Sequence, residues 1–261
     1  MALQEVHWRD DKLLDILHGY VLKNRDRLTI THLSLILNAF ATLAPDSARY
    51  LADLGPELHD KLAAAVNTET FRDQVKSPSN LVEELTPDLT AYSNLWRSLA
   101  CFGLKGAPET AEDSDESRPE VRARGLIRVL CKDLVKVFNG NKRWKATDLS
   151  VGEASTVAIA IASLKLEGAG PIERFIADIG DVIRANLKDA SPMELINLAK
   201  ACHYLRKFEH TRDLYSHVHA ECVTRRNLRQ LDAEDVESLT KVFTSQGVFT
   251  DSPFVSVRVT R

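Results

Sequence analysis

The sequence predicts an all-α protein, an α-solenoid of about five helical hairpins that ends in a short strand-like tail. Residues that cap helices recur ahead of five apolar stripes, and a second amphipathic segment follows each of the first four stripes. Glycine and proline are sparse, with 11 and 9 copies in 261 residues, which favours long regular helices.

Five residues of capping type mark the expected starts of the first helices. They are Thr29, Asp88, Ser150, Ser191 and Asp232. Such side chains accept a hydrogen bond from a backbone N–H of the first turn. Ser150 is followed by Glu153, which fits a capping box, and Ser191 is followed by Glu194 in the same way. Thr86 is an alternative cap for the second of these helices.

A common apolar pattern follows each cap. Positions four, seven, eleven and fourteen residues on are mostly apolar, as in the run from Leu33 to Leu43. This spacing defines one stripe of an α-helix, and a mostly small residue at position ten lets a neighbouring helix approach. The second helices are expected at 48–66, 120–138, 171–187 and 209–226, and an unpaired one at 12–23 precedes the first cap.

These hairpins are too small to bury their apolar stripes alone. Stacking of successive hairpins buries a continuous core and produces an α-solenoid. The alternative is an irregular helical bundle in which the period is accidental. We assign residues 1–249 to one helical-repeat domain, with hairpins starting near residues 29, 88, 150, 191 and 232.

Three segments depart from the repeat. Residues 67–84 are polar and are expected to form a long loop, and residues 106–119 form an acidic insert without aromatic residues, which is typical of disorder. Residues 250–261 form an extended tail, in which Phe254 to Thr260 alternate apolar and polar residues as a strand does. This tail would pair with a partner's sheet, belong to a longer protein, or lie on the last hairpin.

Composition limits the classes of partner. The formal net charge is −3, so any attraction to phosphate must come from local patches. No apolar run approaches the roughly 20 residues that span a bilayer, so membrane insertion is not expected. The first residues resemble neither a signal peptide nor a typical transit peptide. Four cysteines in apolar helical patterns, without a C-x-x-C pair, indicate buried side chains and a reducing compartment.

The sequence contains no motif of a nucleotide-binding protein, a zinc protease or a serine hydrolase. Four histidines gather in the fourth hairpin, and their spacing favours surface or core side chains over a metal site. They are His203, His210, His217 and His219. We therefore expect no catalytic residue, no bound metal and no cofactor.

The most informative feature is a run of cations from Arg118 to Lys145. It holds nine basic and two acidic residues, a local charge of +7. Four cations recur every four residues and share one helix face: Arg124, Arg128, Lys132 and Lys136. The next loop adds Lys142, Arg143, Trp144 and Lys145. Cations for phosphates together with a ring for a base are what single-stranded nucleic-acid binding requires.

A second basic patch consists of Arg225, Arg226 and Arg229, where the cations also complement a helix dipole, and this favours a structural role over phosphate contact. Alternatives to phosphate contact stay open for the first patch. Its cations would instead meet an acidic protein surface, be simply solvated, or be neutralised by the adjacent acidic insert.

Two segments, Leu33–Leu43 and Leu195–Ala201, place leucines around a central small residue. In this they resemble the first helix of the organellar helical-repeat families, namely the heptatricopeptide, octotricopeptide and FAST-kinase-like repeats. The resemblance implies a mitochondrial or plastid protein that binds RNA, often within a ribosome or an RNA-processing complex. In those families RNA lies mainly along the first helices, whereas here the strongest basic stripe is on a second helix.

This difference favours a subunit held inside a large ribonucleoprotein. The first hypothesis is a non-catalytic subunit of a mitochondrial ribonucleoprotein, most plausibly a mitochondrial ribosome, with the basic residues on ribosomal RNA and the helical ridges on protein subunits. The alternative is a protein-only scaffold or an accessory subunit of a large assembly such as a respiratory complex.

Overall fold

A computed structural model describes residues 10–72, 88–105, 118–140, 148–166, 170–247 and 252–254. The regular structure of these residues is helical, without a strand, which confirms the all-α prediction. The chain divides into two compact units, Met1–Arg143 and Trp144–Arg261, whereas the sequence predicts one helical domain over residues 1–249.

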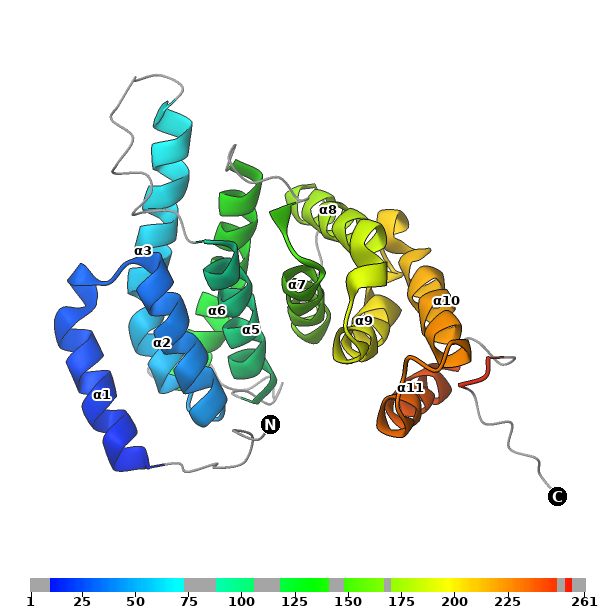
Figure 1. The fold of residues 1–261 in the computed structure, drawn as a ribbon. Coiled ribbons are helices and arrows are strands. Elements are labelled where there is room, and N and C mark those ends of the chain that lie inside the picture. Colours follow the sequence, from blue (N-terminus) through cyan, green and yellow to red (C-terminus); the bar gives the residue numbers. More distant parts are fainter. Residues whose placement is uncertain are drawn as a thin grey trace. The chain divides into compact units, whose positions relative to one another are not determined.

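The first unit pairs helices of like position. Its elements are α1 (Asp11–Asn24), η1 (Arg25–Arg27), α2 (Ile30–Leu43), α3 (Arg49–Arg72), α5 (Leu89–Lys105) and α6 (Pro119–Gly140). Helix α2 packs against α3 and α5, and α3 packs against α6 and α1 (Figure 1). The first helices of successive hairpins therefore contact each other, and so do the second helices.

The second unit repeats this pattern. Its elements are α7 (Val151–Ser163), α8 (Pro171–Asn186), η3 (Leu187–Asp189), α9 (Pro192–Leu205), η4 (Glu209–Thr211), α10 (Leu214–Asn227) and α11 (Ala233–Gln246). Helix α9 lies between α7 and α11, while α8 and α10 cover their own hairpin partners (Figure 1). Both units thus bury a core between first and second helices.

The expected caps lie at the starts of the first helices. Thr29, Ser150, Ser191 and Asp232 each accept a hydrogen bond from the third backbone N–H of their helix. Asp88 does the same, since its Oδ1 lies 2.6 Å from the backbone N of Ala91. Both expected capping boxes are confirmed. Two more boxes use other side chains at the third helical position.

Those additional boxes use His32 and Asp235. The Nδ1 atom of His32 lies 3.2 Å from the backbone N of Thr29, and Asp235 returns to the backbone N of Asp232 at 3.3 Å. These two boxes were not expected, since both boxes predicted from the sequence use glutamate at this position. An imidazole nitrogen or a shorter carboxylate accepts the same hydrogen bond.

Two of the expected helices differ from the observed ones. Helix α3 continues through Arg72 into the predicted loop 67–84, and residues 67–72 hold no glycine or proline that would end it earlier. Residues 73–84 and 106–117 of the two inserts lie outside the described residues. The segment 209–226 is not one helix but η4 followed by α10. The Thr211 hydroxyl donates to the Leu205 carbonyl at 2.7 Å and holds that turn.

The described part of the tail lies on the last helices. Phe254 is fully buried, and its ring lies 5.6 Å from that of Phe243 in α11. The Oγ of Ser252 is 2.6 Å from Nε2 of His219 in α10. Residues 252–254 thus follow the expectation of a tail packed on the last hairpin, while the strand-like residues 255–261 lie outside the described residues.

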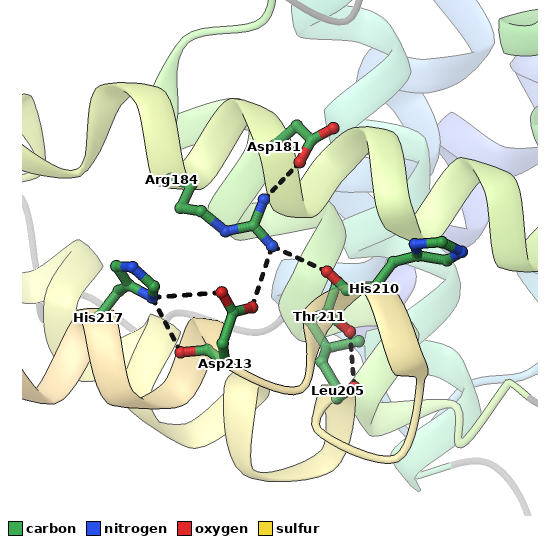
Figure 2. A network of polar contacts seen from close by, with 7 residues as sticks. All are labelled: Asp181, Arg184, Leu205, His210, Thr211, Asp213 and His217. Atoms are coloured by element: carbon green, nitrogen blue, oxygen red, sulfur yellow. Dashed lines mark hydrogen bonds and ion pairs between the residues drawn. The ribbon is translucent and has the colours of Figure 1, made fainter.

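Helix α8 approaches η4 closely through a glycine. A Cβ atom on Gly180 would lie 2.5 Å from Cγ2 of Thr211. In the same region Arg184 of α8 forms ion pairs with Asp181 and Asp213 and donates to the His210 carbonyl at 2.8 Å (Figure 2). This network holds α8 against the connection between α9 and α10.

We expect Gly180→Ala to destabilise the second unit by about 1–3 kcal/mol, because the added methyl group meets a buried, β-branched side chain. The gain in helix propensity from alanine, about 1 kcal/mol, opposes this loss. Urea denaturation measures the difference. Adding Thr211→Ser removes the Cγ2 atom and keeps the hydroxyl, so the double variant should recover stability. Equal stability of Gly180→Ala and the unchanged protein would contradict this packing.

Candidate nucleic-acid interface

Helix α6 has an apolar side that fixes its orientation in the first unit. Ile127, Leu130 and Leu134 are buried against the neighbouring helices. The hydroxyl of Tyr92 in α5 donates to the Leu134 carbonyl at 3.2 Å, and its ring lies 5.7 Å from that of Phe138. These contacts turn the opposite side of α6 toward solvent.

The solvent side of α6 is cationic. Arg128, Lys132 and Lys136 are exposed, and Arg124 is half-buried. Residues four apart on a helix are separated by about 6 Å along the axis and about 40° around it, so these side chains follow one gently turning line. Arg118 and Arg122 extend the exposed cations to the start of the helix, where Glu120 is an acidic neighbour. We call these six cations the α6 cationic face.

One acid that the sequence count placed among these cations faces inward. Asp133 is 4% exposed, and its Oδ2 lies 2.6 Å from Nδ1 of His59 in α3. Its Oδ1 lies 3.3 Å from Nζ of Lys136. The carboxylate therefore links α3 to α6, and Lys136 serves partly as its partner. Its position between Leu130 and Val137 on the apolar stripe already indicates an inward-facing side chain.

The remaining cations differ in how they are held. Arg122 lies 3.8 Å from the Asp53 carboxylate, a distance at the edge of ion pairing. Arg118 and Arg124 each engage another residue. Arg128 and Lys132 form no ion pair with any described residue. These two are therefore the cations of α6 most available to an external anion.

The predicted loop contribution cannot be placed on this face. Lys142, Arg143, Trp144 and Lys145 lie outside the described residues, so the aromatic ring that the sequence analysis set among the cations has no described position. What the described residues contribute is a helix that offers positive charge at regular intervals. Charge at regular intervals suits contact with phosphates, which carries no information about base sequence.

In the second basic patch, Arg225 has the structural role that the sequence left open beside RNA contact. This side chain is 9% exposed and lies under the end of α8. It donates to the carbonyls of Leu187, Lys188 and Ala190 and, through Nε, to Oε1 of Glu221 at 2.8 Å. A buried guanidinium with four protein acceptors is not available to RNA.

The other two members of that patch lie outside the core. The Arg226 guanidinium stands over the Phe254 ring, 5.4 Å from its centroid, which holds the tail residue from outside. Arg229 is exposed and has a positive φ of 58°, as the chain turns after α10. Only Arg229 presents an exposed cation without a described role.

The histidines of the second unit do not converge. The Nδ1 atom of His217 donates to the Asp213 carbonyl, 3.0 Å away, and His210 is exposed on η4 (Figure 2). Burial lowers the pKa of His203 and of His219, which favours their neutral forms. Among the described residues, no group of three histidine, cysteine, aspartate or glutamate side chains is placed to hold a metal.

The cysteines are free thiols. Cys131, Cys202 and Cys222 are buried, as expected, whereas Cys101 is half-buried. Burial raises the pKa of the Cys131 and Cys202 thiols well above the ordinary value, and it raises that of Cys222 to about 12. The neutral thiol that burial favours is a weak nucleophile. None of the described helices is long and apolar enough to cross a membrane.

The fold and this face define the chain as an all-α protein of packed helical hairpins with one cationic helix surface. Comparison of the chain with protein-family models, with curated proteins and with solved structures gives no match.

Proposed function

We propose that the protein is a non-catalytic helical-repeat subunit of a ribonucleoprotein, and that it contacts the RNA backbone through the α6 cationic face. The observation that supports this is the exposure of Arg128 and Lys132, one turn apart and without a described partner. An isolated exposed lysine is often only solvated. Several cations along one helix side, with the nearby acid turned inward, produce a stronger positive potential that attracts a polyanion.

The helical packing supports a repeat architecture. Within each unit, first helices pack on first helices and second helices on second helices. We propose that the hairpins of both units belong to one α-solenoid, as the five capped stripes of the sequence indicate. The organellar resemblance of these stripes makes a mitochondrial ribonucleoprotein, and a mitochondrial ribosome in particular, the proposed setting.

The salt dependence of RNA binding tests this proposal. Binding of the full chain to a labelled, mixed-sequence single-stranded RNA should weaken steeply as salt rises. If four phosphates are engaged, the plot of log affinity against log salt has a slope of about −3. Fluorescence anisotropy over a salt series measures it. Poly-glutamate, added as a competitor of the labelled RNA, measures how well an acidic polypeptide occupies the same surface.

A second candidate function is a protein-only scaffold, in which the same cations meet an acidic protein surface. The exposed apolar side of α1, described below, favours protein contacts at another place on the chain. Poly-glutamate binding as tight as RNA binding, or RNA binding that salt leaves unchanged, would favour this candidate and contradict the proposed contact with RNA.

A further inference from the structure

Helix α1 carries an exposed apolar stripe that the α6 cationic face does not involve. Its inner side is fixed by Leu14 and His18, which are 4% and 8% exposed. The His18 ring stands edge-on to Tyr50 of α3, with ring centroids 4.9 Å apart. On the outer side, Leu13, Ile16, Leu17 and Tyr20 are 43%, 68%, 45% and 68% exposed. We call these four side chains the α1 stripe.

The α1 stripe is a patch and not a scatter of single residues. Nine large apolar side chains are exposed among the described residues, and four of them belong to this one helix of 14 residues. Their spacing, i, i+3, i+4 and i+7, places them on one continuous side of the helix. Contiguous exposed apolar surface of this kind marks an interaction site more often than ordinary surface does.

The packing of the first unit indicates what shape fits this stripe. Helix α1 packs on α3, and α3 packs on α6, so each helix at the second position meets its neighbour side by side. The α1 stripe lies on the side of α1 that no described helix at this position covers. A ridge of side chains at i, i+3, i+4 and i+7 fits between the ridges of another helix.

The charges beside the stripe indicate what kind of partner helix would bind there. Lys12 and Lys23 are exposed and lie eleven residues apart, which is about three turns, so both border the stripe along the same edge. Asp15 lies between this edge and the buried side of α1 and is held by an ion pair with Arg49, and Asp11 also engages another residue. Among the described residues, the charges at this edge that have no described partner are those of Lys12 and Lys23, and a partner with acidic flanks complements them.

An antiparallel pairing of α1 with a second copy of the chain fits these charges poorly. In a two-fold symmetric antiparallel pair, each edge of the helix faces the same edge of its copy. Lys12 of one chain would then approach Lys23 of the other, and like charges across an interface disfavour association. The observations thus favour a different protein as the occupant.

We propose that the α1 stripe docks an amphipathic helix of a partner protein whose apolar side is flanked by aspartate or glutamate. The apolar side chains supply the buried area, and Lys12 and Lys23 set the orientation of the partner helix. This interaction is independent of RNA, so it is testable whether or not the α6 cationic face binds phosphate.

The test uses two stapled, fluorescently labelled helical peptides with the same leucine stripe. One has glutamate at the flanking positions and the other has lysine. The full chain should bind the acidic peptide about tenfold or more tightly than the basic peptide at low salt. Ile16→Asp with Tyr20→Asp should abolish binding, whereas Met193→Asp, at a side chain 62% exposed on α9, should leave it unchanged.

A charge-swapped variant keeps the test decisive if the aspartate variant unfolds. Lys12→Glu with Lys23→Glu leaves the apolar stripe intact and should reverse the preference, so that the basic peptide binds more tightly. Equal binding of both peptides, or of neither, overturns the proposal. The proposal is also overturned if sedimentation shows a dimer that the aspartate variant loses, since a second copy would then be the occupant. It is overturned as well if the chain binds anionic vesicles and neither peptide.

Discussion

Replacing Arg128 and Lys132 together with glutamate is expected to lower the affinity for single-stranded RNA by on the order of a hundredfold at about 0.1 M salt. Each substitution removes one attraction to phosphate and introduces one repulsion, on side chains that are exposed and form no ion pair with a described residue. Fluorescence anisotropy of a labelled RNA measures the change, and the slope of affinity against salt should become shallower.

These two positions separate binding from folding. Lys136 also partners the buried Asp133 carboxylate, and Arg124 engages another residue, so reversing either charge disturbs the protein itself. Arg174→Glu with Lys200→Glu is a matched control, because it makes the same charge change at exposed positions of α8 and α9. A loss of affinity as large in this control as in the α6 variant would contradict a local binding face.

The local features of the fold could be predicted because they depend on short stretches of sequence. A cap and its helix are separated by one turn, and Ser150 and Ser191 carry their own capping boxes in the sequence. The apolar stripe of α6 similarly fixed which of its sides faces solvent, and hence the exposure of Arg128 and Lys132. These are the parts of the candidate site that sequence periodicity determines.

The parts that could not be predicted depend on residues distant in sequence. Lys132 and Asp133 are adjacent in the chain, but Lys132 is exposed and Asp133 is buried. The partner of Asp133 is His59, which is 74 residues away in sequence. Arg225 looked like a helix-end cation because its three carbonyl acceptors lie 35 or more residues earlier, on η3 and Ala190. Charge counting along a sequence assigns every ionic side chain to the surface, and only packing shows which are used inside.

The same reasoning gives the largest expected effect on stability, at Arg225. Arg225→Met preserves much of the apolar stem but removes the guanidinium donor from the carbonyls of Lys188 and Ala190 and from the Glu221 carboxylate, while the Leu187 carbonyl keeps the Ala190 N–H. Removing one partner from a buried ionic network costs about 3–5 kcal/mol, because the remaining groups stay desolvated. Urea denaturation of the chain, followed by circular dichroism, measures this loss for the second unit.

Two further variants identify the cause of that loss. Arg225→Lys keeps the charge, but one ammonium group cannot reach acceptors that the guanidinium fork contacts together, so an intermediate loss is expected. Arg229→Met makes the same chemical change at an exposed residue. It should alter the free energy of unfolding by less than about 0.5 kcal/mol. If Arg225→Met were as stable as Arg229→Met, the guanidinium would not be holding α10 to the end of α8, and Arg225 would return to the set of cations available to RNA.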